Sequence, residues 1–242
     1  MSLLYKYREF SENTDKIILN SELYFASHNS FNDPFDCNLE FREIDSYTNQ
    51  EFEEYCKREQ INEQKDEYLK KLKEDLIKAK SEVGILCMSK NYQNILMWSH
   101  YAKNHEGLCF GFEYGFYDKS KITYTEVKYS KNEEYGLISF FEPQKDEIKR
   151  IFSTKSKFWK YEKEIRLLDL KGGETIGTKK FIKECLKEII FGCKANETNI
   201  KKIIQLCKLN GFEHVVFKKA KLISGKFALD FDKINKNDYL ES

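Results

Sequence analysis

The sequence has little proline and glycine, no long apolar run and no excess of charge of either sign. Only 2 prolines and 11 glycines occur in 242 residues, so no linker is evident and we expect one domain, 1–242. Lysine and arginine total 41 against 40 acidic residues, a formal net charge of +1. This balance excludes nucleic-acid binding by net charge alone and leaves only a local basic patch open. With no stretch of 18 apolar residues and no signal-peptide pattern, we expect a cytoplasmic protein with no membrane contact.

Cysteine pairs, histidine clusters and phosphate-binding glycine motifs are also missing. The seven cysteines are dispersed without a CxxC pair, which argues against a disulfide framework and a zinc ribbon. His100 and His105 lie five residues apart, about 140° around a helix, unlike the i, i+4 histidines of zinc proteases. Asp33, Asp36 and Glu40 approach the spacing of a metal-binding set but suit turn and capping roles better. We therefore expect no metal, and neither a Rossmann turn nor a P-loop is supported.

Short apolar segments of alternating periodicity make up most of the chain. We expect strands at Leu3–Arg8, Leu23–Ser27, Gly84–Ser89, Leu108–Glu113, Ile122–Tyr129, Ile165–Leu170, Lys179–Ile182, Glu188–Gly192, His214–Ile223 and Phe227–Ile234. We expect helices at Ser11–Asn20, Asn94–His105, Gln144–Lys160 and Asn196–Asn210, besides one or two in 50–81. This order predicts an α+β fold with mixed, mostly antiparallel short-strand sheets and covering helices.

The segment 50–81 is charged and helical, with a narrow apolar stripe that includes Phe52, Leu69 and Leu76. Charge runs of this kind usually form solvated faces, so a helical cover is the simpler interpretation. An insertion that meets a partner is the alternative.

Aromatic and polar side chains gather in the segment 97–107. Trp98, His100 and Tyr101 can stack on a ligand and donate hydrogen bonds to it. Aromatic residues at helical spacing are more often packed in a core, so Trp98 is either a core anchor or part of a site.

Two glutamates and an arginine alternate in the segment 157–167. On an extended chain Glu162, Glu164 and Arg166 point to one face, opposite Ile165 and Leu167. Such a trio either separates two carboxylate pKa values for acid–base work or forms a surface ion-pair row on an edge strand. Both interpretations stay open from the pattern alone.

Several blocks of the sequence resemble a bacterial family, the domain of unknown function family 2971. They occur in the family's order: LYKYR (4–8), LYFASHNSFNDPFD (23–36), MWSHYAKNHEGLCFGFE (97–113), KFWKYEKEIRLL (157–168) and EIIFG (188–192). The resemblance covers nearly the whole chain apart from 50–81, and it implies no established reaction.

A second resemblance is to the three-part NAD site of ADP-ribosyltransferases. It rests on a basic first strand, a second strand that ends before a polar loop, and a late strand with a Glu-x-Glu pair. The resemblance implies Glu164 acting on the ribose, Glu162 orienting the acceptor, and Arg166 beside them. Together with the polar segments, it implies an NAD-binding set of Lys6, Tyr7, Arg8, Ser27, Asn32, Asp33, Trp98, His100 and Tyr101.

Two functions follow as hypotheses. In the first, the protein is an NAD-using ADP-ribosyltransferase-like enzyme, of the toxin or phage-defence type, with NAD as substrate and a protein or nucleic-acid acceptor of unknown identity. In the second, it is a non-catalytic module of a bacterial defence or regulatory system, and the same cleft binds a small-molecule nucleotide or a nucleic acid.

Overall fold

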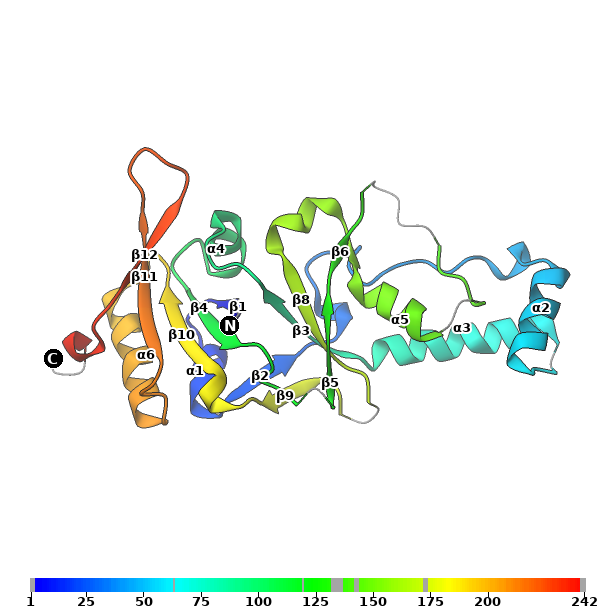
Figure 1. The fold of residues 1–242 in the computed structure, drawn as a ribbon, viewed down its shortest axis with the longest axis horizontal. Coiled ribbons are helices and arrows are strands. Elements are labelled where there is room, and N and C mark those ends of the chain that lie inside the picture. The colour runs from blue at the N-terminus through cyan, green and yellow to red at the C-terminus, as the bar shows by residue number, and fades with distance from the viewer. Residues whose placement is uncertain are drawn as a thin grey trace.

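A mixed eight-stranded sheet forms the centre of the protein (Figure 1), with strand order β12-β11-β10-β4-β1-β3-β8-β5. The computed structural model describes residues 3–62, 64–118, 120–131, 137–141, 144–171 and 174–239. The strands of the large sheet are β1 (Leu3–Arg8), β3 (Gly84–Ser89), β4 (Leu108–Glu113), β5 (Ile122–Glu126), β8 (Glu164–Asp169), β10 (Leu186–Phe191), β11 (Val216–Leu222) and β12 (Leu229–Lys233). All of its ladders are antiparallel except β10 with β11.

In the described residues, two small sheets and six α-helices accompany the large sheet. Antiparallel β2 (Glu22–Phe25) and β9 (Gly177–Lys180) form one pair, and parallel β6 (Lys128–Tyr129) and β7 (Thr154–Lys155) form the other. The helices in the described residues are α1 (Glu12–Leu19), α2 (Asn49–Glu59), α3 (Lys65–Ser81), α4 (Ile95–Tyr101), α5 (Gln144–Ser153) and α6 (Glu197–Leu209). The predicted α+β class with a mostly antiparallel sheet is confirmed.

The two faces of the sheet carry separate apolar clusters because successive strand residues point to opposite sides. On one face, Phe110 packs in a cluster with Ile18 of α1 and Ile203 of α6. On the other face, Cys109 packs with Trp98 of α4, as a small buried hydrophobe. Helices therefore pack on both faces of the central strands, and β1 contributes Leu4 to one cluster and Tyr5 and Tyr7 to the other.

Helix starts follow the capping signals in the sequence. The side chains of Ser11, Asn94 and Asn196 accept backbone N–H groups at the starts of α1, α4 and α6. Two helix ends differ from the prediction: α4 stops at Tyr101 rather than His105, and α5 stops at Ser153 rather than Lys160. The first ends in a turn of residues with positive φ, and the second gives way to β7, which pairs with β6.

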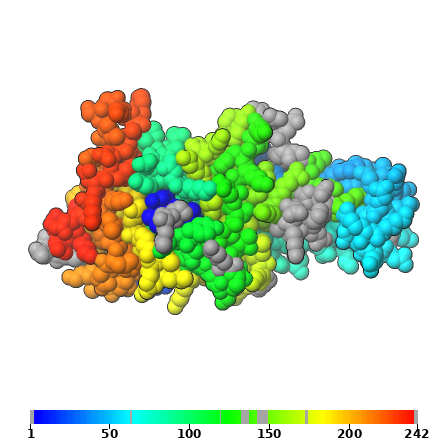
Figure 2. Space-filling view, viewed as in Figure 1, coloured from blue at the N-terminus to red at the C-terminus, as the bar shows by residue number. Residues whose placement is uncertain are grey.

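The predicted helical segment 50–81 lies in two helices, α2 and α3, at one end of the molecule. Figure 2 shows them at the end opposite the C-terminal hairpin of β11 and β12. A capping box between Thr48 and Glu51 starts α2, and Leu69 and Leu76 of α3 pack on Tyr47 and Phe140. This apolar cluster is separate from the two clusters on the faces of the large sheet. The single domain stays a prediction.

The antiparallel hairpin of β11 and β12 forms one edge of the large sheet, and Gly225 in its turn has a positive φ of 73°. None of the helices in the described part of the chain is long and apolar enough to cross a bilayer.

Candidate functional site

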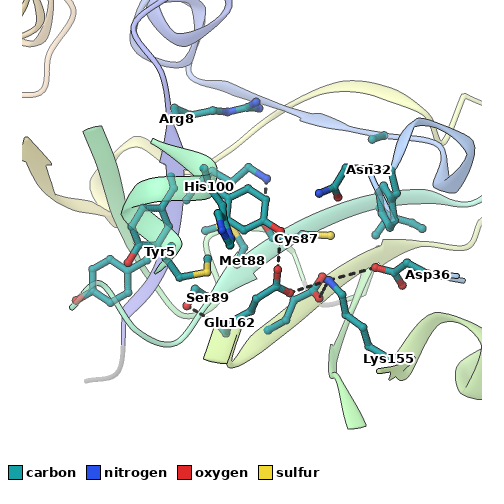
Figure 3. Close-up of a pocket in the computed structure, with 18 of the residues that line it drawn as sticks. Tyr5, Arg8, Asn32, Asp36, Cys87, Met88, Ser89, His100, Lys155 and Glu162 are labelled. Atoms are coloured by element: carbon teal, nitrogen blue, oxygen red, sulfur yellow. Dashed lines mark hydrogen bonds and ion pairs between the residues drawn. The ribbon is translucent and has the colours of Figure 1, made fainter. Parts of the chain in front are cut away.

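The large sheet is split between β1 and β3. These strands share a single register pair, Tyr5 with Ser89, whereas β1 pairs with β4 along its full length. At the far end of β3, Ala26 takes the place of β1 and exchanges two backbone hydrogen bonds with Ile85, of 2.8 and 2.9 Å. The separated strands open a cleft of about 470 Å³ (Figure 3), a volume typical of small-molecule sites.

The floor of the cleft is a buried cluster of three carboxylates and two cations. The Nζ atom of Lys155 lies 2.6 Å from Glu162 and 3.1 Å from Glu164. It also lies 3.2 Å from Asp36. Arg166 is fully buried and donates to Glu164 at 2.8 Å and to both carboxylate oxygens of Asp36 at 2.7 Å. The formal charges leave the cluster one unit negative, so it favours a ligand with hydroxyl groups or positive charge on this side.

The backbone around the two glutamates is turned, not straight. Lys163 has a left-handed backbone with φ of 46°, between the 3₁₀ turn that ends at Glu162 and the start of β8 at Glu164. Ser89 of β3 fixes this turn by donating its hydroxyl to the Glu162 carbonyl at 2.6 Å. Tyr101 of α4 donates to the Glu162 carboxylate, also at 2.6 Å. The glutamates are therefore held from several elements, and β8 is not an edge strand, so the surface ion-pair alternative is wrong.

The two glutamates have opposite protonation tendencies. Burial opposes the charge of Glu164, yet the positive charges of Arg166 and Lys155 hold its pKa well below the usual range. Burial raises the pKa of Glu162, with the neighbouring Glu164 charge adding to the effect and Lys155 opposing it. Glu164 is thus a fixed negative charge, and Glu162 is the carboxyl group that exchanges a proton more readily.

The opposite wall of the cleft is positive. Lys6 bridges the split by donating to the Cys87 carbonyl at 2.9 Å, and burial and the charge of Arg8 lower the pKa of Lys6 to about 8. The Nε of Arg8 is buried and has no hydrogen-bond partner in the described residues. Figure 3 shows Arg8 across the cavity from Glu162 and Lys155. A half-buried guanidinium with an unpaired Nε, beside an ammonium, is suited to a phosphate or carboxylate of a ligand.

The cleft brings together most of the residues predicted from the sequence. Those lining it are Lys6, Tyr7, Arg8, Asn32, His100, Tyr101, Glu162 and Glu164. His100 lies at the exposed rim, where its Nδ1 is 2.9 Å from the Tyr161 hydroxyl. The early basic strand and the late glutamates, more than 150 positions apart in the chain, therefore share one cavity.

Four predicted residues do not line the cleft. Trp98 is fully buried behind Tyr7 and donates its indole N–H to the Tyr92 carbonyl at 2.7 Å, so it is a core anchor. Ser27 and Asp33 accept backbone N–H groups in the loop after β2. Arg166 lies beneath the carboxylates and acts on them, without facing the cavity.

Sequence reasoning missed Asp36 and Lys155. Asp36 was expected to be a turn residue, whereas its buried carboxylate binds Arg166 and Lys155. Lys155 was placed inside a predicted helix, whereas it belongs to β7. The polar DPFD turn was the available signal for Asp36, but no local pattern separates Lys155 from the many other lysines.

The carboxylates of the cleft already have a cation among them. Within the described ranges, no group of three or more His, Cys, Asp and Glu side chains is arranged to hold a metal ion. The ammonium of Lys155 lies between the Asp36, Glu162 and Glu164 oxygens, at the place that a cation would take.

Comparison with known proteins finds a family match over part of the chain and no function. No curated protein and no solved structure matches the chain. Residues 97–167 match a family described as "Protein of unknown function (DUF2971)", a segment that contains Lys155, Glu162, Glu164 and Arg166. Over this segment, the match confirms the family that the sequence blocks predict.

Proposed function

We propose that the cleft binds NAD and cleaves the bond between nicotinamide and ribose, in the manner of an ADP-ribosyltransferase or an NAD glycohydrolase. The observation that carries the proposal is that one cavity has walls of opposite charge. Lys6 and Arg8, whose Nε is unpaired, lie on one wall, and the Glu162–Glu164 pair lies on the other. A diphosphate suits the first wall, and a ribose next to a cationic nicotinamide suits the second.

The residues can be assigned to steps of this reaction. The C1′–N bond breaks, its electron pair leaves with nicotinamide, and the ribose gains oxocarbenium character. Glu164, which stays ionised, stabilises that positive charge. The acceptor nucleophile, or water, then forms the new bond to C1′ and gives its proton to Glu162, whose raised pKa suits a base.

The test is NAD turnover by the purified full chain, with and without a cell lysate as the source of acceptor. Nicotinamide release and a mass increase of ADP-ribose on an acceptor support a transferase, and nicotinamide release without a modified acceptor supports a glycohydrolase. Binding of NAD by calorimetry without turnover under either condition would contradict the enzymatic proposal. A role as a toxin or phage-defence effector would follow from NAD consumption and stays a prediction.

The alternative of a non-catalytic nucleotide- or nucleic-acid-binding module has one observation in its favour. Both Glu164 oxygens already accept hydrogen bonds from Arg166 and Lys155, and both Glu162 oxygens from Lys155 and Tyr101. A fully satisfied polar network is also what holds a binding cavity in shape. Ligand binding without chemistry is the result that this alternative predicts.

We predict that Arg8→Gln weakens NAD binding about 10- to 100-fold, because hydrogen bonds to charged groups contribute roughly 1.5–3 kcal/mol each. Calorimetry of NAD binding measures the change. Arg58→Gln is the matched control, since Arg58 of α2 is exposed and pairs with Glu59 far from the cleft. Equal affinities of the Arg8 and Arg58 variants would show that the cleft does not use Arg8 to hold the diphosphate.

A further inference from the structure

Glu162 depends on a different cation from the other carboxylates of the cluster. Arg166 forms ion pairs with Glu164 and Asp36 but, in the part of the chain that the structure describes, none with Glu162. In the described part of the chain, Glu162 is paired with a single cation, Lys155, at 2.6 Å. Its other partner, the Tyr101 hydroxyl, is uncharged. Lys155 is therefore the cation in direct contact with Glu162, and Lys6 acts on it only from a longer distance.

We propose that Lys155 is the positioning residue that keeps Glu162 ionised and in place beside Glu164. The side chain of Lys155 is 8% exposed and reaches the cleft from β7. Without its ammonium, Glu162 would lie next to Glu164 in a buried site with only the Tyr101 hydroxyl as donor. Two neighbouring buried carboxylates do not both stay ionised, and Glu164 retains Arg166, so Glu162 would take the proton.

Other charged or titratable groups also surround Glu162, and the charged ones act on it in opposite directions. Glu164 and Asp36 are negative and favour protonation of Glu162, whereas Lys6 and Arg166 are positive and oppose it. The groups that face this region are Lys6 of β1, Asp36, Cys87 of β3, His100 and Tyr101 of α4, Tyr129 of β6, Lys155 of β7, Tyr161, and Glu164 and Arg166 of β8. Lys155 is the cation nearest to Glu162, so removing its ammonium should change the protonation of Glu162 more than removing any of the other groups.

The geometry also predicts a second substitution that shifts the titration of Glu162 in the opposite direction to Lys155→Met. Asp36 competes for the same ammonium, at 3.2 Å from Lys155 Nζ. Asp36→Asn removes this negative charge, so the ammonium of Lys155 interacts with the charges of the two glutamates only. Glu162 should therefore lose its proton at lower pH in Asp36→Asn and at higher pH in Lys155→Met.

The direct test is a pH titration of the Glu162 carboxyl by carbon NMR on full-length protein that carries side-chain-labelled glutamate. The Glu162 signal is assigned by its loss in Glu162→Gln. Lys155→Met should raise the titration midpoint by about 1 to 3 pH units, the effect of an opposite charge at contact distance. Lys155→Arg keeps the charge and should return the midpoint most of the way to that of the wild type.

Two outcomes would overturn the proposal: a midpoint that Lys155→Met leaves unchanged, or midpoints that move the same way in Lys155→Met and Asp36→Asn. If Lys155→Met fails to fold, Asp36→Asn still tests the proposal. A Glu162 midpoint that rises or does not move in Asp36→Asn would show that Asp36 and Glu162 do not compete for the Lys155 ammonium. A merely structural role of Lys155 would lower stability without this pair of opposite shifts.

The consequence for catalysis rests on the proposed function. If Glu162 accepts the acceptor's proton, Lys155→Met should move the acidic limb of the pH–rate profile of NAD turnover upward, and Lys155→Arg should restore it. Absence of turnover in the wild type would refute the proposed function and leave the NMR titration as the test of Lys155.

Discussion

Replacing Glu164 with glutamine is expected to slow NAD turnover by about 100- to 1,000-fold, the usual loss when one preorganised electrostatic group is removed from a reacting centre. Glutamine has nearly the same shape but carries no charge, so the developing positive charge on the ribose loses its stabilising partner. Binding of NAD should change much less, because the diphosphate is assigned to Lys6 and Arg8. The loss should therefore appear in kcat and be measurable as nicotinamide release.

Glu197→Gln is the matched control for this variant. Glu197 begins α6 and pairs with Lys219 at 2.5 Å, outside the cleft, so the same chemical change there should leave turnover unaltered. Circular dichroism of both variants checks that the fold is intact. A folded Glu164→Gln protein with wild-type turnover would remove Glu164 from the mechanism.

Replacing Arg166 with methionine is expected to destabilise the fold by about 3–5 kcal/mol, the cost of breaking a buried ion pair from one side. Arg166 is fully buried, and its loss leaves the Asp36 and Glu164 carboxylates with Lys155 as their shared counter-ion. Urea unfolding of the purified protein measures the change in the free energy of unfolding. Arg42→Met is a control, because Arg42 pairs with Glu51 in a more exposed setting and should cost much less.

This destabilisation should depend on pH. In the wild type the pKa of Glu164 is lowered, so its stabilising contribution is fully present above about pH 4.3 and is lost as the pH falls through the folded-state value. Without Arg166, burial raises the pKa of Glu164 above its ordinary value, so the buried charge destabilises the variant near neutral pH and this cost disappears as the pH falls toward 4. The difference in free energy of unfolding between the wild type and Arg166→Met should therefore be largest near neutral pH and become smaller toward pH 4. If this difference is constant from pH 7 to pH 4, lost packing rather than lost charge explains the destabilisation.

Local features of the fold were accessible from the sequence because they depend on neighbouring residues. Caps such as Ser11 and Asn196 set helix starts through hydrogen bonds within three positions. Helix ends were predicted less well: the segment after Ser153 has helical periodicity, yet β7 forms there because it pairs with β6 and brings Lys155 to the carboxylates. Tertiary contacts outweighed a weak local preference.

The sequence by itself determined the α+β class, the early basic strand and the close spacing of Glu162, Glu164 and Arg166, since periodicity and short-range spacing specify them. Only the tertiary structure decided that these groups share a cleft, because the split between β1 and β3 arises from pairing of strands far apart in the chain. It also decided the charge state of the cluster. Asp36 and Lys155 come from separate segments, and burial of their charges together sets which glutamate stays ionised.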